Sequence, residues 1–286
     1  MLFSGGRKHS VALKSNGTVW TWGHNNAGQL GDGSNSDSNI PVQVTGLSNV
    51  IAIAGGSEHT LALLSNNTVW AWGSNSNGQL GNGTTNDSPT PVQVLNLTGI
   101  VSIATGLDHS IALKADGTVW AWGFGSYGQI GNGTNNGTNT IAAQATGLNG
   151  VTAIEGGYGH SLAVRSNGTV WAWGYNNYGQ LGNGNNIDSN IPVQVSNLSG
   201  VVKVAGGFIH SLALKSNGTV SAWGYNNYGQ LGDNTTIDKN TPVQVVSLTG
   251  AVSIAAGDNH SLALKSDASL WGWGYNFPGP LGMVRS

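Results

Sequence analysis

The first candidates for chemistry are six histidines that recur at a regular interval, because imidazole is both a common metal ligand and a common general base. They stand at His9, His59, His109, His160, His210 and His260, separated by 50, 50, 51, 50 and 50 residues. Each belongs to a separate copy of one repeated stretch. Units arranged in a ring hold these side chains too far apart to share an ion. We therefore interpret the histidines as structural residues that tie loops to nearby backbone groups.

Carboxylates are the second candidates, because an enzyme needs paired acids or a nucleophile beside a base. The acidic residues in question come from different units, at Glu58, Asp108, Glu155 and Asp258. Glu155 replaces a small residue found in other units, which exposure at a strand end explains. A further aspartate precedes each P-V-Q-V segment, and a single carboxylate per loop favours an Asx turn over a calcium site. We predict no catalytic residue, no metal and no cofactor.

Composition narrows the possible partners. Charged residues make up 8% of the 286 residues, and the ten Lys and Arg form no basic stripe, which argues against nucleic-acid binding. No apolar run is long enough to span a bilayer, and no signal peptide is recognisable in this chain. Cysteine is absent. Abundant Asn, Ser, Thr, Gly and Trp favour a secreted or cell-surface bacterial protein, which we expect to be a monomer without membrane insertion.

The apolar residues that surround each histidine alternate with the period of a β-strand. Val11 and Leu13 share one face of residues 10–14, and Trp20 and Trp22 share one face of residues 19–23. The Asn-Gly pair between these segments predicts a hairpin turn. Residues 41–44 predict an edge strand that begins with proline, and residues 50–54 predict a strand apolar enough to be buried.

Four short strands per unit, without a helical pattern, predict an all-β fold of four-stranded sheets. One such sheet cannot bury both of its faces, whereas radial stacking of sheets in a β-propeller does so. We expect one domain, residues 1–286, with units at about 1–40, 41–90, 91–140, 141–191, 192–241 and 242–286. Two tryptophans per unit, except where Ser221 replaces one, are predicted to fill the space between blades.

The repeated motifs resemble the regulator of chromosome condensation repeat family over essentially the whole chain. They are G-G-x-x-H-S-x-A-L, V-W-A-W-G-x-N-x-x-G-Q-L-G and P-V-Q-V, and the fifth unit shows the first two at residues 206–214 and 220–232. The resemblance implies a seven-bladed propeller. It also implies two kinds of activity. The eukaryotic founder of the family exchanges guanine nucleotide on a small GTPase, and a secreted bacterial β-lactamase-inhibitor member presents aromatic loop residues to its partner.

This chain departs from the family pattern at both ends. It holds six units rather than seven, and it opens inside a unit because residues 1–4 align with residues 51–54. Pro280 replaces the usual glutamine of the last unit, and no P-V-Q-V follows it. The last unit therefore lacks its fourth strand. These features favour a fragment of a longer array, an incomplete seven-bladed propeller, over a six-bladed ring.

Positions at which the copies disagree carry the functional signal, because the fold does not dictate them. One variable stretch is the dipeptide before each histidine, and the other follows W-G, where units three to six are aromatic. The two stretches flank one hairpin, so we expect both on one face of the propeller. Tyr, Phe and Asn on the loops of a rigid scaffold are typical of a binding surface.

We therefore predict a non-catalytic scaffold that binds a protein partner of unknown identity through this face. The alternatives are guanine-nucleotide exchange on a small GTPase, glycan binding and a propeller enzyme. The predicted partner-binding residues are Arg7, Lys8, Glu58, Leu107, Asp108, Phe124, Tyr127, Tyr158, Tyr175, Tyr178, Phe208, Ile209, Tyr225, Tyr228 and Asp258.

Overall fold

The computed structural model describes residues 1–276, and these residues form β-strands, turns and loops without a helix. The Pro280 substitution lies outside the described residues. No membrane-spanning helix is found among residues 1–276. The strands, grouped by blade, are β1 (Leu2–Gly5), β2 (His9–Leu13), β3 (Val19–Gly23) and β4 (Ser38–Gln43); β5 (Val50–Gly55), β6 (His59–Leu64), β7 (Val69–Gly73) and β8 (Ser88–Gln93); β9 (Ile100–Thr105), β10 (His109–Lys114), β11 (Val119–Phe124) and β12 (Thr138–Gln144); β13 (Val151–Gly156), β14 (His160–Arg165), β15 (Val170–Gly174) and β16 (Ser189–Gln194); β17 (Val201–Gly206), β18 (His210–Lys215), β19 (Val220–Gly224) and β20 (Lys239–Gln244); β21 (Ala251–Ala256), β22 (His260–Lys265) and β23 (Leu270–Gly274).

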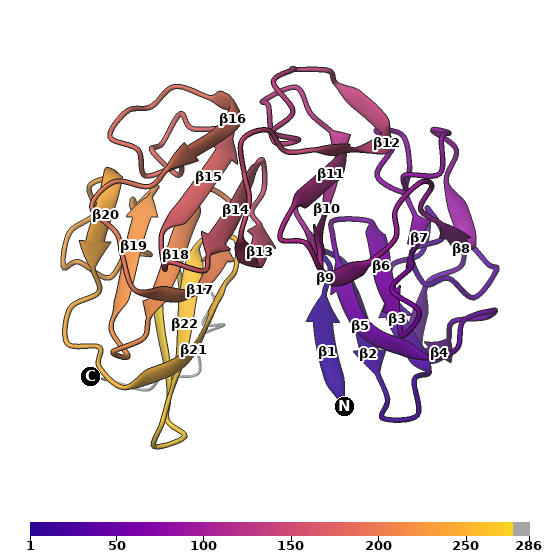
Figure 1. Ribbon diagram of the computed structural model, residues 1–286. Helices are drawn as coiled ribbons and strands as arrows, with labels where there is room; N and C mark the ends of the chain where they lie inside the picture. The colour runs from indigo at the N-terminus through magenta and orange to yellow at the C-terminus, as the bar shows by residue number, and fades with distance from the viewer. Residues whose placement is uncertain (277–286) are drawn as a thin grey trace.

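Each blade is an antiparallel meander whose strands pair in chain order. Five blades have four strands, and the last has three within the described residues. The first strand of each blade lies innermost, and β1, β5, β9, β13, β17 and β21 pack against one another in succession. Figure 1 shows the sheets arranged around a common centre. The prediction of an all-β propeller with six blades is thus confirmed.

The P-V-Q-V segment is the outer strand of the preceding blade. Gln43 pairs with Trp20, and Gln93 pairs with Trp70 in the same way. The described blades therefore span 2–43, 50–93, 100–144, 151–194, 201–244 and 251–274. Their boundaries fall a few residues after those of the sequence units, because the P-V-Q-V strand closes the preceding blade and does not open the next one.

The hydrophobic core lies between successive blades, with one cluster at each of five interfaces. Between blades 2 and 3, Leu61 and Leu63 pack in one cluster with Ala112 and Trp122. The second tryptophan of the W-x-W pair is fully buried in units two to five. The first tryptophan is only half-buried, and in unit 1 the Nζ of Lys14 lies 4.0 Å from the ring of Trp20. The second tryptophan thus lies inside the core between blades, while the first packs at its edge, as Trp120 does between blades 2 and 3 and Trp171 does between blades 3 and 4.

A β-bulge corrects the expectation that residues 50–54 are buried. The pairing register between β5 and β6 shifts between Val50 and Ala52, and this turns Ile51 outward. Ile51 is 50% exposed as a result. Bulges increase the twist of a strand and redirect its side chains. They are frequent at the rims of barrels and next to active sites.

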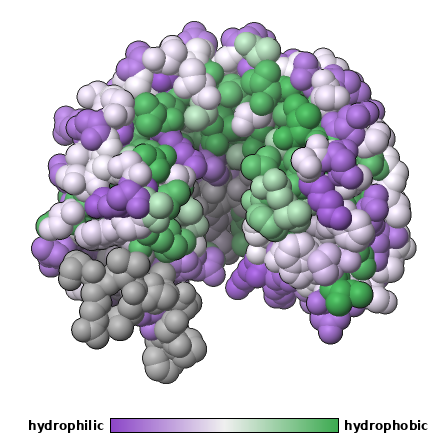
Figure 2. Space-filling model, turned by 90° about the horizontal axis from the view of Figure 1, so that it is seen from below, coloured by the Kyte–Doolittle hydropathy of each residue, from purple (hydrophilic) through white to green (hydrophobic). Residues whose placement is uncertain are grey.

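Within residues 1–276, β21 and β1 are not among the strand pairs that pack extensively, whereas the inner strands of successive blades are. Leu264 and Leu270 of the last blade are 40% and 51% exposed, whereas Leu214 and Val220 at the same positions of blade 5 are 4% and 0% exposed. The space-filling view shows hydrophobic surface around a hollow centre (Figure 2). One face of the last blade is therefore uncovered in the described structure.

Candidate interaction surface

The repeated histidines join adjacent blades. The Nε2 of His59 lies 3.0 Å from the Oγ of Ser110 in the next blade, and this hydroxyl donates to the Gln79 carbonyl over 2.9 Å. The Nε1 of Trp122 donates to the same carbonyl over 2.8 Å. Because Ser110 gives its only proton to Gln79, the proton between His59 and Ser110 belongs to the histidine. We call this arrangement of His, Ser, Gln and Trp the interblade latch.

The interblade latch recurs at all five interfaces between described blades. The other histidine–hydroxyl pairs are His9–Thr60, His109–Ser161, His160–Ser211 and His210–Ser261. Burial lowers the pKa of His59 to about 3, so the ring is neutral at physiological pH. The histidines are thus held by side chains fifty residues away, and not by nearby backbone as the sequence suggested.

Glycine before each histidine is required by close packing. A Cβ added to Gly106 would lie 2.0 Å from the Cε1 of His109 and 2.5 Å from the carbonyl oxygen of Gly157. The chain can therefore pass tightly around each imidazole only without a side chain. The variable dipeptide comes directly after this glycine and is held at the mouth of the central axis.

The first residue of each variable dipeptide lines a central cavity of about 240 Å³. The six residues are Arg7, Ser57, Leu107, Tyr158, Phe208 and Asp258. The rings of Tyr158 and Phe208 lie with their centroids 4.0 Å apart. The cavity is therefore apolar along blades 3 to 5, and it carries Arg7 and Asp258 in the first and last blades. Ser57 was not among the predicted residues.

The second residue of each dipeptide connects to the other variable stretch. The backbone N–H of Phe124 donates to the Asp108 carbonyl over 2.8 Å, and Tyr175 donates to Gly159 in the same way. These bonds place both variable stretches on one face, as the sequence predicted.

The side chains at this second position differ in exposure. Lys8 pairs with Glu58 over 3.3 Å at the surface. Ile209, in contrast, is only 9% exposed. Ile209 therefore offers little accessible surface for the predicted contact with a partner.

The aromatic residues after W-G form one continuous row across blades 3 to 6. Successive ring centroids lie 5.7, 4.9, 6.4, 5.1, 6.0 and 4.8 Å apart, mostly edge to face. We call this row the aromatic ladder, and its members are Phe124, Tyr127, Tyr175, Tyr178, Tyr225, Tyr228 and Tyr275. Tyr275 was not predicted, although its place in the repeat identifies it.

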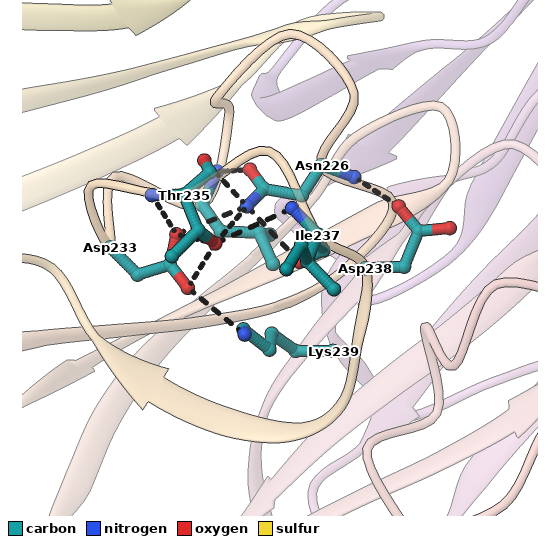
Figure 3. A network of polar contacts seen from close by, with 7 residues as sticks. Asn226, Asp233, Thr235, Ile237, Asp238 and Lys239 are labelled. Atoms are coloured by element: carbon teal, nitrogen blue, oxygen red, sulfur yellow. Dashed lines mark hydrogen bonds and ion pairs between the residues drawn. The ribbon is translucent and has the colours of Figure 1, made fainter.

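A buried asparagine organises the loop that follows two of the ladder residues. The Nδ2 of Asn226 lies 3.0 Å from Asp233 Oδ1 and 3.0 Å from the Thr235 carbonyl, and the Asn226 N–H donates to Asp238 Oδ1 over 2.7 Å. Figure 3 shows these contacts together with Lys239, whose Nζ lies 3.6 Å from Asp233. The aspartate before P-V-Q-V thus closes a long loop, and does not cap a local Asx turn as the sequence suggested.

The third unit replaces this arrangement as a whole. Gly125 and Gly137 stand where other units have the asparagine and the aspartate. The Nδ2 of Asn139 donates instead to the carbonyls of Gly123 and Asn136, over 3.1 and 2.9 Å. A Cβ on Gly125 would lie 2.6 Å from the Nδ2 of Asn139. The Asn139 amide therefore occupies the space that the side chain of the loop asparagine fills in other units. The spacing of 51 residues between His109 and His160 reflects one additional residue in this unit, and β12 has seven residues where the other outer strands have six.

Of the acidic candidates for catalysis, Glu58 and Asp108 lie close enough for the charge of Glu58 to raise the pKa of the Asp108 carboxyl. Glu155 is half-buried on the innermost strand of its blade, and burial raises its pKa to about 7. The charge of Lys203 on the next blade opposes this rise. Within residues 1–276 no three His, Asp or Glu side chains are placed to hold a metal ion. The exposure expected for Glu155 from the sequence is wrong, because the side chain faces a neighbouring inner strand.

Radially stacked antiparallel sheets, joined by the interblade latch, define a β-propeller protein built from repeats of the G-G-x-x-H-S and W-G type. The chain belongs to the RCC1-like domain family, which it matches over residues 2–286. The resemblance drawn from the motifs is thereby confirmed.

Solved structures of related propellers are similar along most of this chain. Human WBSCR16 is 26% identical with a TM-score of 0.84, and the match covers 93% of this chain and 72% of that one. Prp20p from Saccharomyces cerevisiae is 27% identical with a TM-score of 0.85, and the match covers 96% and 71%. The ultraviolet-B receptor UVR8 of Arabidopsis thaliana is 45% identical over 38 residues, which is 13% of this chain and 9% of the receptor's length.

Proposed function

We propose that this protein is a non-catalytic scaffold that binds a partner protein through the face carrying the aromatic ladder and the mouth of the central cavity. The observation that carries the proposal is the ladder itself, a row of aromatic rings in contact across four blades. Aromatic side chains supply large contact area at low conformational cost and are enriched in protein interfaces.

The ladder lies outside the hydrophobic clusters between the blades. The clusters that form the core between blades consist of aliphatic residues, alanines and tryptophans from the strands and their connections, and none includes a ladder residue. Tyr228 and Tyr275 are 46% and 38% exposed. Rings that contribute little to the core and remain accessible fit a recognition role.

Related propellers support a protein partner. A yeast structure shows Kap60 bound to RCC1 (Prp20), and Prp20p is described with binding properties to Gsp1p and histones. Protein binding is thus a property of similar propellers, and the partner of this chain is a matter for experiment.

The test is affinity capture followed by measurement of Kd for the captured protein. The ladder variant changes Tyr178 and Tyr228 to Ala. The matched control changes Ile191 to Ser, because this residue is 47% exposed on the outer strand β16. We expect the control to bind as the wild type does and the ladder variant to lose at least tenfold in affinity. Equal affinity of all three proteins contradicts the proposal.

Guanine-nucleotide exchange on a small GTPase is the second candidate. The similarity to Prp20p, whose binding to Gsp1p is named with its structure, favours it. A release assay with labelled GDP on a panel of small GTPases tests it directly. Acceleration that is lost in the ladder variant supports exchange through this face, and no acceleration across the panel rejects it.

We also propose placement outside the cell or at its surface. The low content of charged residues, 8%, and the abundance of Asn, Ser, Thr and Gly support it. Fractionation of the source cells with an antibody against the propeller tests this point, and recovery in the cytosolic fraction alone contradicts it.

A further inference from the structure

A second cavity, of about 130 Å³, opens on the ladder face in blade 3. Its walls include Phe124, Tyr127 and Tyr158, and Leu107 and Asp108 also line it. The rings of Phe124 and Tyr127 meet edge to face, with their centroids 5.7 Å apart. The cavity is therefore a small aromatic enclosure with one acidic group in its lining.

No lysine or arginine within residues 1–276 forms an ion pair with Asp108, although the charge of Arg7 acts on its carboxyl from beyond ion-pair distance. The Asp108 carboxylate makes no hydrogen bond and no ion pair within residues 1–276, whereas Glu58, at the same position of the preceding unit, pairs with Lys8 over 3.3 Å. Asp108 is partly buried. Burial raises the pKa of its carboxyl, the charge of Glu58 raises it further, and Arg7 lowers it. A partly buried carboxylate without a paired counter-charge is unfavourable, and a cation from outside relieves the cost.

The combination of acid and rings occurs in one described unit only. In unit two Glu58 stands beside Ser74 and Asn77, which supply no ring. Units four and five have the rings, but Gly159 and Ile209 take the acid's position. Gly159 also keeps the cavity open, because a Cβ there would lie 3.4 Å from the ring of Tyr127 and 3.3 Å from the Cβ of Tyr175.

We propose that this cavity receives a cationic side chain, lysine or arginine, projecting from the partner protein. The aromatic faces of Phe124, Tyr127 and Tyr158 attract a cation through their quadrupoles, and Asp108 supplies the charge-assisted hydrogen bond. This proposal rests on the proposed protein-binding function and specifies the chemistry of the partner. The partner presents a basic residue to blade 3 and apolar surface to the ladder in blades 4 to 6.

The test uses small probes, so that it does not depend on knowing the partner. Nα-acetyl-lysine methylamide, Nα-acetyl-arginine methylamide and the neutral Nα-acetyl-norleucine methylamide are titrated against the whole chain, and the ring resonances of Tyr127 and Tyr158 are followed by NMR. We expect saturable shifts with a cationic probe and none with norleucine. The lysine and arginine arms decide which cation fits better.

The test variant is Asp108→Asn, and the matched control is Asp116→Asn. Asp116 lies in the hairpin between β10 and β11, at the opposite end of the same blade, and it is exposed. We expect Asp108→Asn to weaken binding of the cationic probe at least tenfold, Asp108→Glu to retain part of it and the control to bind as the wild type does. Unchanged binding by Asp108→Asn overturns the proposal, and so does equal binding of norleucine. An amide spectrum that superimposes on the wild type away from blade 3 shows that the variant is folded.

Partner capture separates this proposal from the proposed function. If Asp108→Asn binds the captured partner normally while the ladder variant does not, the cation site is wrong and the scaffold function stands. If the ladder variant also binds normally, the proposed function itself fails. Loss of partner binding in Asp108→Asn, together with loss of probe binding, supports both.

Discussion

The Nε2 of His59 and the Oγ of Ser110 lie 3.0 Å apart, fully buried between blades 2 and 3. This contact joins residues 51 positions apart and fixes how one blade sits on the next. A directional bond inside an aliphatic interface selects a single docking register, which apolar packing alone specifies less sharply. The same relationship at every interface between described blades explains why the histidine recurs in a repeat whose neighbouring residues vary.

Removal of the hydroxyl is expected to destabilise the fold. Ser110→Ala leaves the buried Nε2–H of His59 without an acceptor and removes one donor to the Gln79 carbonyl. An unsatisfied buried donor costs about 1–3 kcal/mol. We expect a loss of that size in the free energy of unfolding, measured by urea titration.

The first blade provides the control for this variant. Ser10 occupies the same repeat position, but it is half-buried and its side chain makes no hydrogen bond within the described residues. Ser10→Ala is expected to change stability by less than about 0.5 kcal/mol. Equal losses for Ser10→Ala and Ser110→Ala would show that the latch adds nothing beyond local strand effects.

Acid is predicted to unfold this protein steeply. Burial lowers the pKa to about 3 for His59, His109 and His210 and to about 4 for His9 and His160. In the unfolded chain these groups titrate near 6.5, so the unfolded state binds more protons as the pH falls from 6.5 toward 4. Stability is therefore fully present above about pH 6.5 and is lost below it.

The size of the effect follows from linkage. Each buried histidine removes about 2 kcal/mol of stability at pH 5, or about 10 kcal/mol for the five together, which is comparable to the total stability of a typical domain. Glu155, whose pKa is raised to about 7, acts in the opposite direction but is a single group. We expect the urea midpoint to fall sharply between pH 6.5 and 4.5. A midpoint that stays constant down to pH 4 would rule out burial of neutral histidines.

Close approach of inner strands predicts a second difference between residues at the same position of different blades. A Cβ on Gly156 would lie 2.5 Å from the Thr105 carbonyl oxygen and 2.6 Å from the Gly106 nitrogen, both backbone atoms of blade 3. At the same position of the first blade, a Cβ on Gly5 meets nothing within 4 Å. Gly156→Ala is expected to cost about 1–3 kcal/mol through overpacking. Gly5→Ala serves as the control and is expected to melt within a degree or two of the wild type; a comparable loss for both would show that space is not the cause.

The sequence predicts the fold well because the fifty-residue period and the period-two strands are local signals. It predicts that the variable stretches share one face, because one hairpin separates them. It does not predict which residue of a dipeptide faces the central cavity, since that depends on the turn after Gly-Gly. Leu107 therefore lines the central cavity while its neighbour Asp108 does not, and Ile209 is covered.

The hydrogen-bond partners of the histidines could not be predicted from the sequence for a different reason. His59 bonds to a serine hydroxyl in the next unit, and only the stacking of blades brings the two together. The same holds for the aromatic enclosure around Asp108, which Tyr158 completes from blade 4. Each repeat contains only some of the residues that make such a contact, and the others lie in the next repeat.

The loop asparagine gives a last prediction that joins stability to the binding face. Asn226 is fully buried, its Oδ1 accepts from the Leu231 N–H over 2.9 Å, and its amide nitrogen reaches Thr235 and Ile237. Asn226→Ala leaves several loop carbonyls without donors, so we expect a loss of about 2–4 kcal/mol, which is the cost of more than one broken buried bond.

The neighbouring Asn227 is the matched control, because it is exposed and its side chain makes no hydrogen bond within the described residues. Asn227→Ala is expected to leave the urea midpoint unchanged. Asn226 is flanked by Tyr225 and followed by Tyr228, both ladder residues. Loosening of the loop should therefore also alter the near-ultraviolet circular dichroism of the tyrosines in Asn226→Ala alone. A destabilised variant with an unchanged tyrosine signal would show that the ladder keeps its geometry without the loop beneath it.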